Sequence, residues 1–332
     1  MSEVFAFAGE IKVATMLASV IPVLMREKIP DRLIESPRSV AELAENTAIN
    51  CDRLHRFLQL IEVKGLAKYD ADTKLWHSTE KTAVIAGQFA NDTWSWMFSR
   101  YTQEGILELG EILYSEKSVY EHSGKKPIFE HLKENSDLLK KFQNSMKAFT
   151  KLHADAVERA LDLEGCNKIL DVGGGDGSLA IGLAKIYPDK KFGVYEIPEV
   201  IHMINENVAS EGLSQNIEAI SGSMFESVPH SFDSILMKHI LHDWRDNDCK
   251  TILSNCRKAL TPGGKLFIID TVVERGHPAF SIKVFKDINM LAQLGSKERT
   301  TEEFRNLLEE TGFRFEKVTS AGTDDIVLAT AI

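Results

Sequence analysis

Two histidines, His239 and His242, lie three residues apart in the stretch "LMKHILHDW" (residues 236–244). On a helical turn the two rings would share a face, because side chains three residues apart are neighbours on a helix. Such a pair could ligate a metal, or one ring could transfer a proton near neutral pH. A tetrahedral zinc site needs further Cys or His ligands in matching positions, and the sequence offers no such pair. We therefore expect no metal, which leaves proton transfer as the chemistry of this stretch.

Three aspartates, Asp243, Asp246 and Asp248, follow the second histidine. They lack the glycine of a calcium-binding loop, which argues against a calcium site as well. A short polar side chain just before a helix typically accepts hydrogen bonds from the first backbone amides. We expect Asp246 or Asn247 to cap a helix over "DCKTILSNCRKAL" in this way.

Two carboxylates elsewhere in the chain could act together with His242. Asp270 ends the apolar run "GKLFIID", and Glu298 lies in "SKERTTEEF". Residues at the carboxyl ends of neighbouring parallel strands converge on one rim, so we expect Asp270 to reach the imidazole and hold it in one tautomer. A histidine held in this way can act as a general base and contribute roughly 10² to 10⁴ in rate. We expect His242 to be this base and His239 to be a packing residue.

The carboxyl half of the chain alternates short apolar runs with segments of helix length. The runs are "KILDV", "KFGVYEI", "IEAISGSM", "FDSILMK", "GKLFIID", "FRFEKVT" and "DIVLATAI". Strands separated by helices form βαβ units around a mainly parallel sheet. We expect a doubly wound α/β domain, with ligands bound beyond the carboxyl ends of its strands. The fourth strand, "FDSILMK", would place "HILHDW" on that rim.

A glycine-rich loop, "DVGGGDGSLA", follows the first of these strands. Glycines let the backbone turn tightly and approach a ligand, so we expect this loop to bind a cofactor. The dinucleotide pattern G-x-G-x-x-G is broken, because Ser178 stands at its last position when counted from Gly173, and no G-K-[ST] follows to make a P-loop. Glu196 ends the next strand about twenty residues later, where a carboxylate is either a ribose-binding group or a solvated acid.

The first 100 residues show a different pattern. Apolar residues recur at helical spacing over residues 11–86, and Ser39 with Glu42 makes a capping-box arrangement. Two short strands are predicted in "LAKYDADTKLWHST", which completes a winged helix-turn-helix pattern. This region holds about twelve Lys and Arg against about thirteen Asp and Glu, whereas a DNA-binding face needs a basic excess. A packing and dimerisation module is favoured over a DNA-binding one.

Length and composition restrict the class of protein further. A chain of 332 residues exceeds one typical domain, and 43% hydrophobic residues can build a sizeable core. The net charge of -10 argues against nucleic acid as the main partner. The amino terminus lacks the features of a secretory leader, and we find no stretch of about 18 uncharged apolar residues to span a membrane. Four scattered cysteines without C-x-x-C spacing predict a reducing, cytoplasmic location.

Six longer stretches carry a resemblance to a known family. They are "ILDVGGGDG", "YEIPEVI", "GSMFESVP", "MKHILHDW", "NCRKALTPGGKLFIID" and "GSKERTTEEFRNLLEETGF". In this order and spacing they resemble S-adenosylmethionine-dependent O-methyltransferases of the caffeic-acid type and of the bacterial phenazine or polyketide type. The resemblance covers nearly the whole chain. It implies a winged-helix dimerisation domain over residues 1–100, a helical linker and substrate-pocket region over 101–160, and a Rossmann-like S-adenosylmethionine-binding catalytic domain over 161–332.

The resemblance implies that S-adenosylmethionine binds at the glycine loop. Gly173 and Gly175 would approach its methionine part, and Glu196 would hold the ribose. The full set of implied cofactor contacts is Asp171, Gly173, Gly175, Glu196, Ile197, Ser223, Met224 and Lys238, with Met224 packed on the adenine. Ser223 departs from the family, which usually has "GDMF" where this chain has "GSMF". A hydroxyl accepts the adenine amino group without charge assistance, so we expect weaker adenine binding than in the family.

The same resemblance implies methyl transfer to a hydroxyl of a small aromatic compound, with His242 as the base between Asp270 and Glu298. The acceptor pocket is expected to include Met146, Phe149, Asp243, Asn289 and Met290. Residues of these types also suit an ordinary core. A homodimer is implied as well, built through the amino-terminal helices. Two other functions stay open: a relative that uses the cofactor in cyclisation, decarboxylation or hydroxylation, and a DNA-binding regulator that senses the cofactor.

Overall fold

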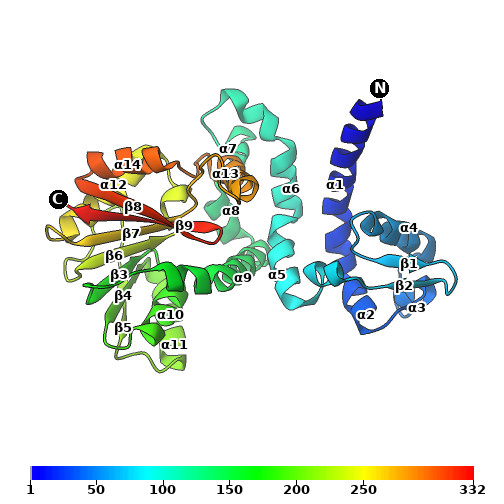
Figure 1. Cartoon of the computed structure of the whole chain (residues 1–332), viewed down its shortest axis with the longest axis horizontal. Coiled ribbons are helices and arrows are strands. Elements are labelled where there is room, and N and C mark those ends of the chain that lie inside the picture. Colours follow the sequence, from blue (N-terminus) through cyan, green and yellow to red (C-terminus); the bar gives the residue numbers. More distant parts are fainter. Residues whose placement is uncertain (1) are drawn as a thin grey trace. The chain divides into compact units, whose positions relative to one another are not determined.

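The computed structural model describes residues 2–332, including all side chains except those of residues 2 and 150–154. The chain divides into two compact units (Figure 1). The first comprises Met1–Glu104 and Leu132–Phe149, and the second comprises Gly105–His131 and Thr150–Ile332. The predicted linker over residues 101–160 is therefore shared between the two units. Five helical segments run through this shared part: α6 (Arg100–Leu107), η2 (Leu109–Tyr114), α7 (Val119–His122), α8 (Ile128–Glu134) and α9 (Ser136–Ala160).

The amino-terminal unit is mainly helical, with one small hairpin. Its elements are α1 (Ser2–Arg26), α2 (Ile29–Glu35), α3 (Val40–Ala44), α4 (Cys51–Glu62), β1 (Lys68–Asp70), β2 (Leu75–His77), η1 (Glu80–Ile85) and α5 (Gly87–Met97). The predicted capping box begins α3: the Ser39 hydroxyl accepts from the Glu42 amide, and the Glu42 carboxylate accepts from the Ser39 amide. The antiparallel hairpin β1–β2 matches the two predicted strands, and its Trp76 is completely buried.

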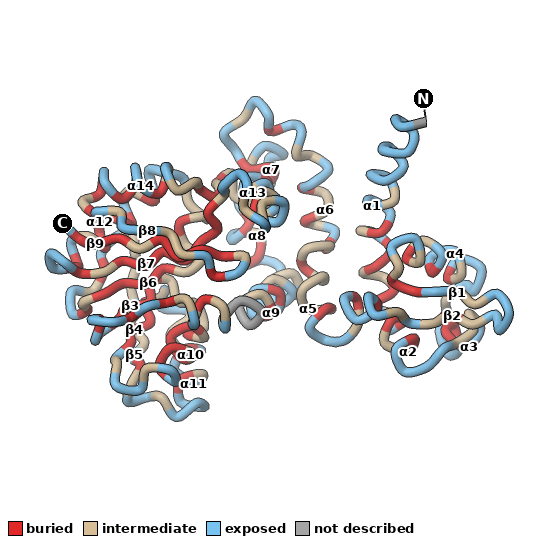
Figure 2. Tube along the Cα trace, viewed as in Figure 1, coloured by how far each residue is buried: buried red, intermediate tan, exposed pale blue. Residues whose placement is uncertain are grey.

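Helix α1 leaves many apolar side chains uncovered within its unit. Val4, Phe5, Phe7 and Ile11 are all more than half exposed, whereas residues nearer its carboxyl end, such as Leu24, are buried (Figure 2). By length and composition alone, Glu3–Arg26 could cross a membrane: its mean hydropathy is 1.7, and 17% of its most apolar window is buried. Glu10 and Lys12 lie inside this helix, so it contains no window of about 18 uncharged residues.

The carboxyl-terminal unit contains a seven-stranded sheet with the strand order β5-β4-β3-β6-β7-β9-β8 (Figure 1). Its strands are β3 (Lys168–Val172), β4 (Lys191–Glu196), β5 (Ile217–Ser221), β6 (Ser234–Lys238), β7 (Lys265–Asp270), β8 (Phe313–Ala321) and β9 (Asp324–Ala331). The helices between and beside them are α10 (Ser178–Ile186), η3 (Pro198–Val200), α11 (Ile201–Ser210), η4 (Leu241–Asp243), α12 (Asp246–Ala259), α13 (Phe280–Leu294) and α14 (Thr301–Glu310). Strands β3 to β7 pair in parallel, as predicted.

Both faces of this sheet are buried, which explains why its strands read as continuous apolar runs. Successive side chains of a strand point to opposite faces, so Leu266 and Ile268 join one core layer and Phe267 and Ile269 join the other. The first layer includes apolar residues of α12 and α14, and the second includes those of α10 and α11. The strands are correspondingly the most buried part of the unit in Figure 2. The doubly wound α/β prediction is confirmed.

Strand β9 alone reverses the direction of the sheet, and β8 beyond it runs parallel to β7 again. Strand β9 runs antiparallel to both β7 and β8. Its first residues therefore lie beside the last residues of β7, with Asp325 opposite Asp270. Two aspartates from the start of β9, Asp324 and Asp325, thus reach the same rim as the carboxyl ends of the parallel strands.

Candidate active site

His242 lies in the short helix η4, directly after strand β6. Its side chain is 14% exposed. The Nδ1 atom is 3.0 Å from Glu298 Oε1, and the Nε2 atom is 3.4 Å from Asp243 Oδ1. Since a carboxylate can only accept, Nδ1 donates to Glu298. The Nε2 atom is left as the ring nitrogen beside the Asp243 carboxylate.

Asp270 and Glu298 both come close to the ring, but in different ways. Asp270 Oδ1 is 3.8 Å from His242 Nδ1, beyond hydrogen-bond distance. The expectation that Asp270 fixes the tautomer is therefore wrong, because Glu298 makes that hydrogen bond. Asp270 is completely buried, and neither of its carboxylate oxygens has a hydrogen-bond partner among the described residues. It acts on the ring through charge.

The charges of this group perturb one another strongly. Burial lowers the pKa of His242, but the carboxylates of Asp243, Asp270 and Glu298 outweigh burial and raise it to about 10. Burial is the main cause that raises the pKa of Asp270 to about 7 and that of Asp243 to about 6. One imidazole and the carboxyl groups of Asp243 and Asp270, all largely buried, thus have shifted pKa values, which is typical of groups that transfer protons.

The donor atoms of His242, Asp270 and Glu298 all lie within 4.8 Å of one another, so this set could hold a metal ion. It offers one nitrogen and two oxygens, a mixed set that suits several divalent metals. The Nδ1 atom, however, is already engaged by Glu298. Our expectation that no metal is needed remains a prediction.

Arg299, a completely buried residue that the sequence did not single out, holds the backbone of this segment. Its Nη1 donates to the Leu241 carbonyl at 2.7 Å, and its Nη2 donates to the Trp244 carbonyl at 2.9 Å. These two carbonyls flank His242, so the guanidinium fixes the turn that presents the ring. Arg299 follows Glu298 directly, but nothing in the sequence indicates that its side chain returns to this turn.

The prediction of a cap for helix α12 is wrong. The N-cap residue is Arg245, without a side-chain hydrogen bond, and the helix begins at Asp246. The Asp246 carboxylate instead accepts from Arg299, at 2.8 Å from Nη2 and 3.1 Å from Nε. Asp246 therefore forms an ion pair with Arg299 instead of capping the helix. This ion pair connects the start of α12 to the residue that follows Glu298.

His239 is more than a packing residue. Its Nε2 is 3.1 Å from Asp324 Oδ2, and its Nδ1 is 3.2 Å from Lys238 Nζ. Its ring stacks on that of His242, with centroids 5.2 Å apart and planes at 17°. Burial, followed by the neighbouring Lys238 ammonium, lowers the pKa of His239 to about 4. The ring is therefore neutral at physiological pH.

The glycine loop after β3 is shaped for close approach. Gly173 has a φ of 70°, and a Cβ there would collide with Ile240. Gly175 has a φ of 57°, and a Cβ there would meet no atom within 4 Å, so this glycine borders open space. Asp171, at the start of the loop, is 1% exposed and has no hydrogen-bond partner for either carboxylate oxygen among the described residues. Burial raises its pKa to about 7, against the effect of Lys238.

Glu196 ends strand β4, next to the glycine loop on the same rim. Its Oε2 accepts a hydrogen bond from the amide of Ile197 at 3.2 Å. Burial raises the pKa of the Glu196 carboxyl, which that amide opposes. Ile197 itself is 44% exposed. Glu196 is thus partly buried beside the loop. This environment favours a carboxylate that binds ligand hydroxyls over one that is fully solvated at a strand end.

Ser223 and Met224 follow strand β5 in a turn of fixed geometry. The Ser223 carbonyl accepts from the amides of Glu226 and Ser227, and Asn255 Nδ2 donates to the Met224 carbonyl at 3.0 Å. Met224 is partly buried and packs against the core. The Ser223 hydroxyl makes no hydrogen bond to another described residue, so it is available to a ligand.

The residues predicted to line the acceptor pocket fall in different units. Met146 (36% exposed) and Phe149 lie on the part of α9 that belongs to the amino-terminal unit. Asn289 and Met290 lie on α13 in the carboxyl-terminal unit and are partly buried. Helix α13 contacts η4, which carries His242 and Asp243. The role of these residues in acceptor binding stays a prediction.

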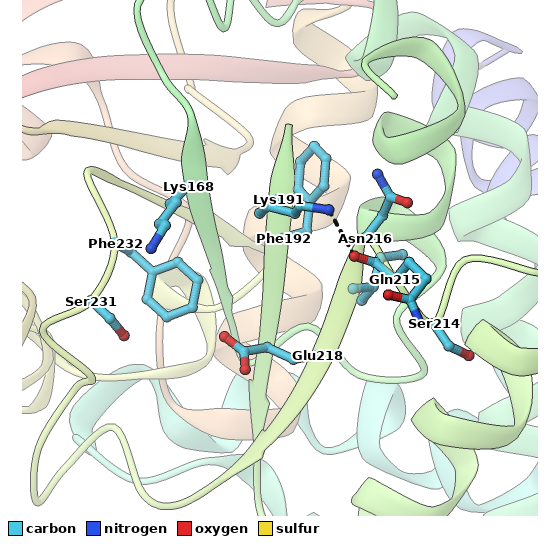
Figure 3. Close-up of a pocket in the computed structure, with 10 residues that line it drawn as sticks. Lys168, Lys191, Phe192, Ser214, Gln215, Asn216, Glu218, Ser231 and Phe232 are labelled. Carbon is cyan, nitrogen blue, oxygen red and sulfur yellow. Dashed lines mark hydrogen bonds between the residues drawn. The ribbon is translucent and has the colours of Figure 1, made fainter. Parts of the chain in front are cut away.

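A hollow of about 250 Å³ lies at the opposite end of the sheet (Figure 3). Its lining includes Lys168 and Lys191, the first residues of β3 and β4, together with Glu218 of β5. All three are exposed, and Lys191 Nζ donates to the Gln215 carbonyl at 2.8 Å. Nothing in this hollow resembles the buried charges of the rim.

Comparisons with known proteins agree on one family. Residues 106–314 match the family described as an O-methyltransferase domain. The (RS)-norcoclaurine 6-O-methyltransferase of Thalictrum flavum subsp. glaucum is 31% identical over 307 residues, which cover 86% of this chain and 83% of that protein. The mitomycin biosynthesis 6-O-methyltransferase of Streptomyces lavendulae is 28% identical and covers 93% of this chain and 89% of its own. The solved structure of the mitomycin 7-O-methyltransferase MmcR matches with a TM-score of 0.89 and 25% identity, covering 100% of this chain and 98% of the other.

The sheet, the glycine loop and the buried charges at one rim define a Rossmann-like methyltransferase. The match over residues 106–314 and the relative at 31% identity are more specific: the chain belongs to the O-methyltransferase family and is an S-adenosylmethionine-dependent enzyme. The rim fits this cofactor. The unpartnered Asp171 carboxylate suits the ammonium group of the methionine part, and the open space beside Gly175 leaves room for it.

Proposed function

We propose that this enzyme methylates a hydroxyl group of a small aromatic metabolite and that His242 is the general base. One observation carries the proposal: Glu298 engages His242 Nδ1 at 3.0 Å, which leaves Nε2 to accept a proton from a substrate. Bound S-adenosylmethionine supplies an electrophilic methyl group. The contribution of the protein is to place the acceptor oxygen in line with that group and to remove its proton.

Each residue of the His242 group has a distinct part in this proposal. Glu298 accepts from Nδ1, so Nε2 is the nitrogen that is free of a proton whenever the ring is neutral. Asp270, without hydrogen-bond partners among the described residues, stabilises the imidazolium that forms when the proton arrives. Asp243 Oδ1, at 3.4 Å from Nε2, lies where the acceptor hydroxyl must come, so its carboxylate is placed to orient that hydroxyl.

The aromatic class of acceptor rests on the relatives and on the chain's own side chains. The relatives named above act on norcoclaurine and in mitomycin biosynthesis, and a third, from Lysobacter antibioticus, is a phenazine O-methyltransferase. Met146, Phe149 and Met290 would supply apolar contacts to a flat ring, and Asn289 a polar one. All these relatives are named as O-methyltransferases, which does not favour a non-methylating reaction for this chain.

A direct test is to incubate the purified protein with isotopically labelled S-adenosylmethionine and a panel of phenols, phenazines and hydroxyquinones. We expect label to appear on a hydroxyl oxygen of at least one compound, read by mass spectrometry. Conversion of a compound without label transfer would contradict methyl transfer. Label on nitrogen or carbon alone would contradict the choice of a hydroxyl acceptor.

We further propose that the protein is a cytoplasmic homodimer that binds neither nucleic acid nor membrane. The exposed apolar residues of α1, including Phe5 and Phe7, support a second copy as the partner that covers them. Four free cysteines, three of them buried, support a reducing compartment. Light scattering at micromolar concentration should give twice the chain mass, and a monomer mass would contradict the dimer. Binding to lipid vesicles through α1 would contradict the absence of a membrane partner.

A further inference from the structure

A chain of four hydrogen-bonded side chains runs from helix α13 to the end of β6. Lys286 Nζ lies 2.6 Å from Asp324 Oδ1, Asp324 Oδ2 lies 3.1 Å from His239 Nε2, and His239 Nδ1 lies 3.2 Å from Lys238 Nζ. We call these four residues the His239 relay. Asp324 is completely buried, and Lys238 and His239 are partly buried. The relay is outside the His242 group, and of its four members only Lys238 has been given a role so far, as an expected cofactor contact.

The chemistry of the relay fixes every proton in it. The Lys238 ammonium can only donate, so His239 Nδ1 must accept. The Asp324 carboxylate can only accept, so His239 Nε2 must donate. Burial opposes ionisation of Asp324, but His239 and Lys286 outweigh it and lower the pKa of that carboxyl. An ionised Asp324 behind the ring strengthens Nδ1 as an acceptor for Lys238, because hydrogen bonds in a chain polarise one another.

The backbone of His239 also indicates a built arrangement. His239 has a φ of 56°, in the left-handed region that a non-glycine residue rarely adopts. Its amide donates to the Ile269 carbonyl at 2.9 Å, which fixes the turn at the end of β6. Such a conformation costs free energy and persists only where the surroundings hold it. Here the hydrogen bonds of the side chain to Asp324 and Lys238 hold it.

Lys238 has a specific reason to need such support. Within the described residues its ammonium has no carboxylate within 4 Å, and His239 Nδ1 is its hydrogen-bond partner. Burial lowers the pKa of Lys238, whereas the carboxylates of Asp324 and Asp171 raise it. Asp171, on the adjacent strand β3, is likewise buried and without a hydrogen-bond partner. The rim therefore holds one cation and one anion side by side, each with unused capacity to bind.

This pair matches the charged end of an amino acid. Along the rim, Glu196 ends β4, Asp171 lies near the end of β3 and Lys238 ends β6, in the order of the strands. With a ribose at Glu196, the methionine part of the cofactor would extend toward Asp171 and Lys238. Asp171 would then be placed to bind its α-ammonium, and Lys238 its α-carboxylate.

We propose that His239, anchored by Asp324, is a positioning residue that holds the Lys238 ammonium where the α-carboxylate of the cofactor binds. This inference rests on the cofactor binding that the proposed function requires, but not on the acceptor or on the base. It predicts an effect on ligands that carry the amino-acid end and no effect on ligands that lack it.

Calorimetry with two ligands tests this prediction. S-adenosylhomocysteine carries the amino-acid end, and 5′-methylthioadenosine keeps the adenosine and lacks that end. His239→Phe preserves a ring to stack on His242 but removes both nitrogens. We expect its Kd for S-adenosylhomocysteine to rise about tenfold and its Kd for 5′-methylthioadenosine to stay within about twofold of the wild type. Asp324→Asn should also raise the Kd for S-adenosylhomocysteine, by a smaller factor, and leave the Kd for 5′-methylthioadenosine unchanged.

A conservative variant provides the matched control. In His239→Gln, the amide oxygen can accept from Lys238 and the amide nitrogen can donate to Asp324, so this variant should recover part of the affinity that His239→Phe loses. Equal weakening of both ligands in His239→Phe would mean a merely structural role and would overturn the inference, as would unchanged affinity for S-adenosylhomocysteine. Failure of the wild type to bind S-adenosylhomocysteine would overturn the proposed function and this inference together. Normal binding without methyl transfer would overturn the proposed function alone.

Discussion

At the carboxyl ends of the parallel strands, charged side chains are buried, whereas at the amino ends of the same strands they lie in solvent. Asp171, Asp270 and Asp324 at the first end are each at most 1% exposed. Lys168 and Lys191 at the second end are exposed, in the hollow shown in Figure 3. Both ends belong to one sheet and are covered by the same two layers of helices, so the fold itself does not require this difference.

The difference shows what marks a site in this protein. Burying a carboxylate without a hydrogen-bond partner costs free energy, so a stable fold avoids it unless a ligand or a reaction uses the group. Asp171 and Asp270 both lack such partners among the described residues. A hollow is not sufficient evidence of function, because the charged side chains that line the one at the amino ends are all exposed. The following predictions test whether function is confined to the carboxyl ends.

The largest effect is expected from His242→Gln. Without the imidazole the acceptor proton has no base, so methyl transfer should fall by roughly 10² or more at neutral pH, while cofactor affinity is retained. Steady-state rates and calorimetry on the same protein measure the two quantities. A variant with the wild-type rate would remove His242 from the mechanism.

The pH dependence of the wild-type rate follows from the charges around His242. Neighbouring carboxylates raise the pKa of His242 to about 10, so the ring is mostly protonated at neutral pH in the ligand-free protein. A protonated ring cannot accept, and the rate should therefore rise as the pH rises through neutrality toward that value. In His242→Gln any rise should follow the ionisation of the phenol itself, near pH 10. Rate profiles from pH 6 to 10 for both proteins would contradict this account if the wild-type rate fell as the pH rose.

Asp270→Asn should give an intermediate loss, smaller than that of His242→Gln. The amide keeps the shape of the side chain and removes the charge that stabilises the imidazolium, while the Glu298 hydrogen bond at 3.0 Å still sets the tautomer. We also expect the pKa of His242 to fall, because one of the carboxylates that raise it is gone. The rate profile of the variant should therefore shift to lower pH. A loss as large as that of His242→Gln would mean that Asp270 does more than supply charge.

Glu196→Ala should weaken S-adenosylmethionine binding about tenfold or more. The change leaves two ribose hydroxyls unpaired in a partly buried place, at roughly 1 to 3 kcal/mol. Calorimetry measures the affinity directly. The matched control is the double variant of Lys168→Ala and Lys191→Ala at the amino ends, which should leave both affinity and rate within about twofold of the wild type. A large loss of affinity or rate in that double variant would contradict the view that function is confined to the carboxyl ends of the strands.

The smallest effect is expected from Ser223→Asp. We expect the hydroxyl of Ser223 to accept the adenine amino group without charge, whereas a carboxylate there would make a charge-assisted hydrogen bond. We expect affinity for S-adenosylmethionine to rise by a few-fold, with little change in the rate at saturation. Weaker binding would mean that the adenine amino group points elsewhere.

The sequence predicted the parts of the rim that depend on local rules. Glu196 and Asp270 were placed at the rim because each ends a short apolar run, and parallel strands end at a common rim. Asp171 and Lys238 were expected there from the family resemblance, and both lie at or near the ends of their strands. The capping box at Ser39 was confirmed, since both of its partners lie within four residues.

The parts that the sequence did not predict depend on long-range packing. The partner of Asp324, His239, is 85 residues away in the chain, and the pairing requires β9 to run antiparallel at a fixed register. The hydrogen bonds of Arg299 to the His242 turn span more than 50 residues. Asp246 was predicted to cap a helix from its local context, yet Arg299 recruits its carboxylate. The partner of a buried charged side chain depends on which distant segments pack together, and the spacing of residues in the sequence does not predict that packing.

Strand β9 has a consequence for how the protein is made. It is synthesised after every other strand of the sheet, yet it lies between β7 and β8, so β8 cannot join the sheet before β9 arrives. Until then Lys283 and Lys286 lack their partners, Asp325 and Asp324, and the edge of β7 is open to pairing with other chains. A nascent chain that stops before residue 324 therefore has most of its core but no complete cofactor rim. Cofactor binding is therefore expected to stabilise the fully translated sheet more than a chain that stops before this strand.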